Sequence, residues 1–364
     1  MYETREDNDL AFMLQYENIA WYDEGKVRIL DRRVYPAKTH FVVCHSHVEV
    51  MQAIRDMVTQ SAGPYTAAPM GMALAAWECR NMKEDEQISY LEKASNCISN
   101  ARPTTRKRME QLTQSCVEVA TKAIAEGVRT DIAIRDFTVR ANNMRYSKIA
   151  AAATYLVDMF PKNGTVMTQC FAETIVGMML RECRRRSNDI RLFCPETRPY
   201  FQGARLTATV CHEMGFDTTV ITDNMPAFVM EREKVDVFTC AADAITMDGY
   251  VFNKVGTSQI AICAKHFGIP VFVSGTPDSG HPTHDTVTIE MRDPRFSLEA
   301  MGIRTVLKPD ASENPIKGYY PAFDMTPPHL ISGIATEKGI LSPYDLASYF
   351  TLGGSGEYSY KDRI

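Results

Sequence analysis

Four runs of apolar, strand-forming residues in the second half of the chain end on or beside a side chain that could do chemistry. Cys170, Glu196, Asp223 and Asp243 stand at or near the ends of GTVMTQC, DIRLFCPE, DTTVITDN and VDVFTCAAD. Ligands bind outside the carboxyl ends of the strands in an open parallel sheet. A thiol and several carboxylates, the groups of acid–base catalysis, are therefore expected at one crevice.

Each of these residues also has an ordinary structural role. Free cysteine is among the most buried residue types, so Cys170 alone would more often be a core thiol. Asp223 or Asp243 alone would more often cap a helix. Their occurrence at successive strand ends is what favours a functional site.

Two further segments point to a phosphate or a sugar. FNKVGT places Asn253 and Lys254 just before a helix, whose first N–H groups can hold an anion while the lysine adds a point charge. NARPT places Arg102 at another helix start, which also suits a phosphate. A surface ion pair is an equally ordinary role for Arg102.

Metal and nucleotide sites have little support in the sequence. CHSH at residues 44–47 and HPTHD at residues 281–285 resemble fragments of metal sites, but neither has a second half at ligand spacing. His281 follows a fifth expected strand, PVFVSG, so a substrate contact is the better interpretation. No G-x-G-x-x-G follows the first strand. We therefore expect neither a metal nor a cofactor.

The elements that must position these residues fall into two parts. Residues 18–44 alternate around a turn at residues 23–25, which predicts a small antiparallel sheet, and helical periodicity follows. From residue 160, short β-rich runs alternate with helices, which predicts a parallel sheet. The expected fold class is α/β, with a mainly helical domain at 1–150 and a parallel-sheet domain with a C-terminal tail at 151–364.

The overall composition limits the partners. The chain has 364 residues, 45% of them hydrophobic, and a net charge of −5. That composition is typical of a soluble globular protein and offers no basic field for nucleic acid or an anionic membrane. We expect neither a membrane span nor a signal peptide. Ten scattered cysteines, none in a C-x-x-C pair, predict free thiols and a cytoplasmic location.

Long segments of the chain resemble one family. ETRPYFQGARLTA, AADAITMDGYVFNKVGT, AKHFGIPVFV and YYPAFDMTPPHLISGIATEKGIL are similar to segments of S-methyl-5-thioribose-1-phosphate isomerases, as are IAWYDEGKVRILDRRVYP and AIRDMV near the N-terminus. The resemblance covers roughly residues 18–345. The wider family includes ribose-1,5-bisphosphate isomerases, 5-deoxyribose-1-phosphate isomerases and regulatory subunits of the eukaryotic initiation guanine-nucleotide exchange factor.

The resemblance implies a Rossmann-like C-terminal domain, a homodimer, and conversion of an aldose 1-phosphate to a ketose 1-phosphate without metal or nucleotide. It implies that Cys170 and Asp243 are catalytic. The substrate contacts that it implies are Arg102, Gln202, Asn253 and Lys254. Asp243 would protonate the ring oxygen if burial favours its neutral form. Cys170 would act as a base for an enediolate route or support a hydride shift, and nearby cations favour its thiolate.

Two departures from the family pattern concern the substrate. Phe171, Ala172 and Glu173 replace an Asn-Thr-Gly that usually follows the cysteine, so a ring and a carboxylate are introduced, and Phe171 is either a core side chain or one that narrows the pocket. In addition, TQSAGPYTAAPMG lacks the arginine of the family's phosphate loop, although Ser61 and the backbone at Gly63 could donate hydrogen bonds. The open alternatives are therefore another C1-phosphorylated sugar, such as 5-deoxyribose 1-phosphate or ribose 1,5-bisphosphate, or a non-catalytic regulatory protein.

Overall fold

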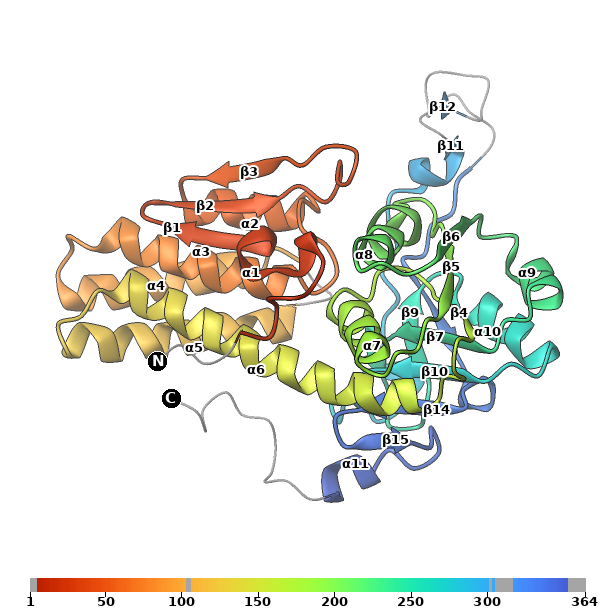
Figure 1. The fold of residues 1–364 in the computed structure, drawn as a ribbon. Helices are drawn as coiled ribbons and strands as arrows, with labels where there is room; N and C mark the ends of the chain where they lie inside the picture. The colour runs from red at the N-terminus through yellow and green to blue at the C-terminus, as the bar shows by residue number, and fades with distance from the viewer. Residues whose placement is uncertain (1–4, 103–105, 301–302, 305–316, 353–364) are drawn as a thin grey trace. The chain divides into compact units, whose positions relative to one another are not determined.

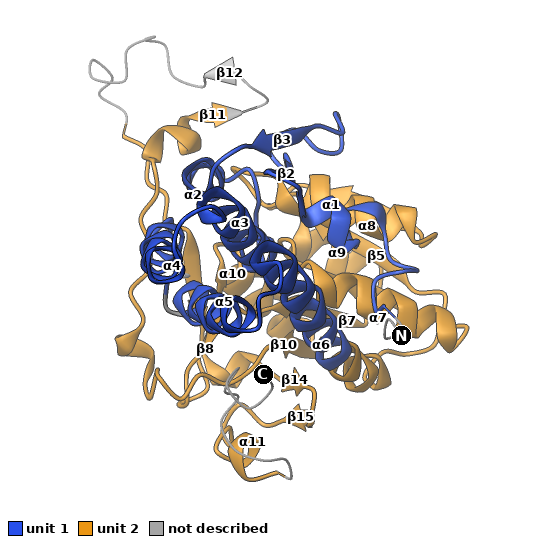
Figure 2. Cartoon of the chain, turned by 90° about the vertical axis from the view of Figure 1, so that its left-hand side faces the viewer, with its two compact units in different colours: residues 1–149, 355–364 blue, residues 150–354 orange. Residues whose placement is uncertain are grey.

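The computed structural model describes residues 5–102, 106–300, 303–304 and 317–352. The chain divides into two compact units, residues 1–149 with 355–364 and residues 150–354 (Figure 2). The division falls within the long helix α6 (Thr130–Asp158). The expected C-terminal tail lies outside the described residues.

The first unit combines a small sheet with helices. β1 (Ala20–Asp23), β2 (Lys26–Leu30) and β3 (Phe41–Cys44) pair antiparallel in that order, which confirms the sheet expected from the alternating pattern. Gly25 has a φ of 77° in the β1–β2 turn, a conformation that glycine adopts without strain. The helices are α1 (Tyr16–Ile19), α2 (His47–Arg55), α3 (Pro64–Cys79), α4 (Glu84–Ser99), α5 (Arg106–Ala125) and α6.

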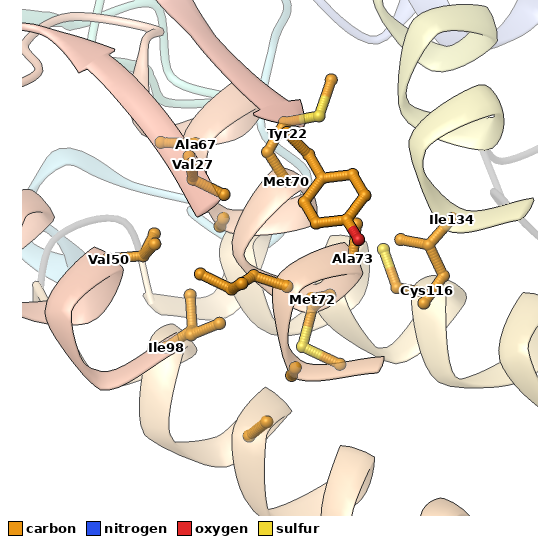
Figure 3. Close-up of a cluster of buried hydrophobic side chains, with 14 of the residues drawn as sticks. Tyr22, Val27, Val50, Ala67, Met70, Met72, Ala73, Ile98, Cys116 and Ile134 are labelled. Carbon is orange, nitrogen blue, oxygen red and sulfur yellow. The ribbon is translucent and has the colours of Figure 1, made fainter. Parts of the chain in front are cut away.

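Helix α3 is the centre of this unit, because nearly all of its residues are buried. Figure 3 shows how side chains of the sheet and of the surrounding helices meet around Met70 and Met72. A Cβ on Gly71 would come within 2.9 Å of Val50 Cγ1, so this glycine lets α2 approach α3 closely. A core of this kind makes the first unit an independent packing unit.

The second unit is built on a mostly parallel sheet. The strands are β4 (Thr165–Met167), β5 (Arg191–Pro195), β6 (Thr218–Ile221), β7 (Val237–Ala241), β10 (Val271–Ser274), β14 (Gly333–Thr336) and β15 (Gly339–Leu341). Their order is β15-β14-β10-β7-β4-β5-β6, and β15 is the antiparallel edge strand. The sheet is doubly wound, as in Rossmann-like folds, and this confirms the expected fold class.

Helices cover both faces of this sheet. α7 (Thr174–Arg185) and α8 (Ala208–Glu213) lie on one face, and α9 (Pro226–Arg232) and α10 (Thr257–His266) lie on the other (Figure 1). A short helix, α11 (Ser348–Thr351), follows β15. No helix among the described residues is long and apolar enough to span a bilayer.

A second, small sheet was not expected from the sequence. β8 (Ala244–Ile245), β9 (Val251–Lys254) and β13 (Phe323–Thr326) pair antiparallel in the order β13-β9-β8. It joins the segment after β7 to a segment about 70 residues further along the chain. A two-stranded ribbon of β11 (Glu299–Ala300) and β12 (Ile303–Arg304) stands apart from both sheets.

Candidate active site

The candidate site lies where the strand order of the main sheet reverses. β4 and β7 are neighbours, and the chain continues from β4 to β5 and β6 on one side and from β7 to β10 on the other. The chain leaves these two strands in opposite directions, which makes this a topological switch point, the place where open α/β sheets bind ligands. Cys170 lies in the loop after β4 and Asp243 in the loop after β7.

The backbone of Cys170 is held in a left-handed conformation, with a φ of 59°. Its N–H donates to Thr197 Oγ1 at 3.1 Å, and its carbonyl accepts from Thr207 Oγ1. Both threonines belong to the loop and π-helical turn that follow β5. A non-glycine residue in this conformation is strained, so the surrounding bonds over-determine where the thiol stands.

The segment after β5 is in turn fixed against its own strand. A Cβ on Gly203 would lie 1.8 Å from the carbonyl oxygen of Pro195, so only glycine allows the π-helical turn to pack here. Asp223 accepts from the backbone N–H groups of Thr197 and Arg198, each at 2.7 Å. The sequence places Asp223 among the groups that converge on the crevice, but its carboxylate is occupied in holding this loop.

The Cys170 thiol is neutral in the protein alone. Burial raises the pKa of Cys170 to about 11, and the charge of Asp243 acts in the same direction. The cations of Lys254 and Arg292 lower this pKa, but by less. The prediction of a thiolate is therefore wrong for the protein alone, since the expected cations are present but burial outweighs them.

Asp243 is exposed, although its charge reaches the thiol. Its backbone N–H donates to the carbonyl of Phe252 at 2.8 Å, which ties the residue to the small sheet. The burial that an acid role requires is therefore not provided by the described residues around Asp243.

Asn253 and Lys254 are the last two residues of β9, and both are buried. Asn253 Nδ2 donates to Thr257 Oγ1 at 3.1 Å, and Thr257 Oγ1 donates to the carbonyl of Lys254 at 2.7 Å. Lys254 Nζ lies 5.1 Å from the centroid of the Phe323 ring. The small sheet thus places the ammonium group of Lys254 near Cys170.

The start of α10 is already occupied by an anion of the protein itself. The Asp324 carboxylate accepts from the N–H of Gly256 at 2.7 Å and from the N–H of Ser258 at 3.1 Å. The expectation that these N–H groups hold a substrate anion is therefore wrong. Burial raises the pKa of Asp324 to about 6, although the same two N–H groups lower it.

Gln202 and two of the residues that follow Cys170 are buried side chains. Gln202 is buried, and its Oε1 has no hydrogen-bond partner among the described residues. Phe171 and Glu173 are buried as well, and Glu173 precedes α7 with a φ of 52°. An acceptor without a partner is what a substrate hydroxyl would satisfy.

Arg292 and Tyr320 belong to this cluster and were missed from the sequence. The charge of Arg292 acts on Cys170, and the Tyr320 hydroxyl interacts electrostatically with both. They lie about 120 and 150 residues after Cys170, outside any strand of the main sheet. Only the family-like segment around Tyr320 signalled that this part of the chain matters.

Three expected contacts lie in the first unit. Ser61 and Gly63 precede α3, and a Cβ on Gly63 would come within 2.0 Å of Thr59 Oγ1, so glycine is required there. The guanidinium of the buried Arg32 donates to the carbonyl of Gln60 at 2.7 Å, in the same loop. Arg102 follows α4 and is partly buried. The role of these residues in the site stays a prediction.

The histidines of HPTHD form hydrogen bonds with nearby side chains. The described residues contain no group of three or more His, Cys, Asp or Glu side chains that could hold a metal ion. His281 Nδ1 is hydrogen-bonded to Thr286 Oγ1 at 3.0 Å, and His284 pairs with Asp248 at 2.8 Å. A substrate contact for His281 stays a prediction.

The doubly wound sheet, with a thiol and a carboxylate in the loops at its switch point, defines a Rossmann-like α/β protein. Residues 61–343 match the model of the initiation factor 2 subunit family. The chain belongs to this family.

Its relatives are similar along most of their length. A methylthioribose-1-phosphate isomerase of Pseudothermotoga lettingae is 31% identical over 86% of this chain and 92% of its own, and one of Xylella fastidiosa is 32% identical over 88% and 91%. A solved 5-methylthioribose 1-phosphate isomerase from Pyrococcus horikoshii has a TM-score of 0.75 at 27% identity, covering 92% of this chain and 95% of its own. A translation initiation factor eIF-2B delta subunit from A. fulgidus has a TM-score of 0.74 at 27% identity, covering 90% and 96%.

Proposed function

We propose that this chain is an aldose–ketose isomerase that converts 5-methylthioribose 1-phosphate to the corresponding ketose 1-phosphate. The observation that carries the proposal is the similarity to methylthioribose-1-phosphate isomerases over nearly the whole chain. The position of Cys170 and Asp243 in the loops after neighbouring strands at the switch point supports it, because isomerisation needs a group that moves a proton next to the carbon atoms that exchange hydrogen.

The reaction begins with opening of the sugar ring. Asp243 donates a proton to the ring oxygen as the bond between that oxygen and C1 breaks. The exposed carboxyl of Asp243 can act as this acid once the bound sugar removes water from around it. The hydroxyl on C2 then returns a proton to Asp243, the hydrogen on C2 moves with its electron pair to the electron-poor C1, and a C2 carbonyl results.

The state of Cys170 favours a hydride shift over an enediolate route. A thiol whose pKa is about 11 is protonated at neutral pH and is a poor base. Cys170 would then form the dry wall beside C1 and C2 rather than accept a proton. The two routes differ in D₂O, because an enediolate exchanges with solvent and brings deuterium to C1, whereas a hydride shift does not.

Substrate contacts are proposed for the residues that the family resemblance implies. They are Arg102, Gln202, Asn253, Lys254, Ser61 and Gly63. The buried ammonium of Lys254 and the open acceptor of Gln202 support their part in binding a phosphorylated sugar. The buried Phe171 and Glu173 support a second candidate, an isomerase of another C1-phosphorylated sugar, because they alter the wall beside the thiol.

We also propose a homodimer in the cytoplasm. Large apolar side chains stay exposed on neighbouring elements of the second unit, with Phe228 on α9 64% exposed and Ile262 on α10 57% exposed. Burial of these side chains against a second copy would remove them from water. All ten cysteines are free thiols, which supports a reducing compartment.

The proposal is tested by supplying the purified protein with a panel of sugar 1-phosphates and measuring ketose formation. Turnover of 5-methylthioribose 1-phosphate is expected, and Cys170→Ser and Asp243→Asn should each abolish it while the protein stays folded. Turnover of another sugar 1-phosphate instead would select the second candidate. Binding without turnover of any of them would favour the regulatory alternative and defeat the proposal.

A further inference from the structure

Arg292 presents a buried donor without a hydrogen-bond partner, and its charge is close enough to Cys170 to lower the pKa of the thiol. Its side chain is 9% exposed, and its Nη1 has no hydrogen-bond partner among the described residues. Its charge acts directly on the thiol. A buried donor without an acceptor costs stability, so a protein that retains one has a use for it.

The guanidinium of Arg292 is held by a carboxylate and two aromatic rings. Its Nε donates to Glu290 Oε1 at 3.0 Å. The guanidinium carbon Cζ of Arg292 lies 5.6 Å from the centroid of the Tyr200 ring and 5.9 Å from the centroid of the Phe323 ring. A planar cation between two rings and a carboxylate is fixed in direction, which is what preorganised electrostatic stabilisation requires.

Tyr320 adds a second donor at the same place. Its hydroxyl is buried, and the Arg292 guanidinium approaches it in a hydrogen bond of poor geometry, so that both this bond and the cation's charge lower the pKa of Tyr320. No described residue accepts the proton of this hydroxyl. Burial acts more strongly and raises the pKa of Tyr320, so the phenol stays neutral and keeps its proton to donate.

We propose that Arg292 Nη1 and Tyr320 Oη together bind the oxygen on C2 of the sugar and stabilise the negative charge that develops there. This inference rests on the proposed isomerase function. When the hydroxyl on C2 gives its proton to Asp243, the oxygen carries the charge until the C2 carbonyl forms. The phosphate already has other proposed contacts, whereas this oxygen has none.

The kinetic test uses Arg292→Gln and Tyr320→Phe, with Arg191→Gln as a matched control. Arg191 also stacks on a ring, Phe193 at 5.1 Å, and pairs with a glutamate, but it stands at the amino end of β5, away from the crevice. We expect kcat to fall about 10²-fold or more in Arg292→Gln, with KM changed by less than about threefold. Tyr320→Phe should lower kcat in the same direction, and Arg191→Gln should not.

A rise in KM with kcat unchanged would mean that Arg292 and Tyr320 contact a group of the bound substrate, such as the phosphate, and that result would overturn the assignment. A binding measurement distinguishes a catalytic loss from misfolding. The double variant Arg292→Gln/Cys170→Ser should bind substrate as tightly as the single variant Cys170→Ser. Loss of that binding would also overturn the proposal, because the contact would then serve the substrate and not the developing charge.

A second experiment tests the same proposal without measuring turnover. Alkylation of Cys170 by iodoacetamide, followed by mass spectrometry of its peptide between pH 7.5 and 9.5, reports the fraction of thiolate. The rate should fall about twofold or more in Arg292→Gln and stay unchanged in Arg191→Gln. An unchanged rate in Arg292→Gln would refute the proximity itself. The wild-type protein could also isomerise no sugar 1-phosphate while the alkylation rate falls in Arg292→Gln. The proposed function and the assignment to the C2 oxygen would then both be wrong, but the effect of the Arg292 cation on the thiol would be confirmed.

Discussion

Asp324 should make the second unit less stable as the pH rises through 6, and Asp324→Asn should remove this effect. The carboxylate is enclosed between the start of α10 and β13, and its two N–H donors do not fully replace the water it loses. Burial therefore raises its pKa from 3.8 to about 6. An asparagine has no proton to exchange in this range and cannot show the same dependence.

The sign and the size follow from the linkage between protonation and folding. Between pH 4 and pH 6 the folded protein holds a proton on Asp324 that the unfolded chain has lost. The stability contributed by the neutral carboxyl is thus fully present below about pH 4 and is lost as the pH rises through 6. A pKa about two units above 3.8 corresponds to about 3 kcal/mol over that interval.

The assay must report on the second unit alone. Both tryptophans, Trp21 and Trp77, lie in the first unit, so fluorescence would follow the wrong part of the chain. Labelling of the buried Cys240 in β7 by a pyridyl disulfide during urea titration reports unfolding of the second unit. Cys116, fully buried in α5, serves as the internal control for the first unit.

The quantity to compare is the difference in unfolding free energy between the wild type and Asp324→Asn, because the other carboxylates titrate in both proteins. Between pH 4 and pH 7 the wild type should lose about 2 kcal/mol of unfolding free energy relative to Asp324→Asn, as read from Cys240. A difference that stays constant with pH would refute the reasoning, and so would an equal change at Cys116.

Three further outcomes are expected. Gly203→Ala should lower both the melting temperature and kcat, because the new methyl group would lie 1.8 Å from a backbone oxygen. The control Gly215→Ala places a methyl group with nothing within 4 Å, so it should lower the free energy of unfolding by only about 1 kcal/mol, the cost of alanine at a φ of 82°. Lys254→Gln should shift the pH dependence of alkylation at Cys170 to higher pH, since it removes the cation that lowers that pKa most; an unshifted profile would contradict this. Tyr22→Phe should cost the first unit about 1 kcal/mol by tryptophan fluorescence, because its buried hydroxyl donates to a carboxylate on α6 at 2.7 Å.

Much of the arrangement was predictable because it is encoded locally. Alternation at residues 18–44 and the repeated strand–helix rhythm after residue 160 record which face of each element is buried, and they predict the small sheet and the α/β unit. Since the carboxyl ends of parallel strands meet at one edge, the same pattern predicts that Cys170 and Asp243 share a crevice.

The sequence by itself thus determined the fold class and the two central side chains of the candidate site. Only the tertiary structure decided what surrounds them. Pairing of β9 with β13 brings Asp324 to the start of α10, 68 residues away in the chain, where it displaces the expected substrate anion. Packing alone places Arg292 beside Cys170 and buries the thiol enough to keep it neutral, because desolvation depends on atoms contributed by distant segments.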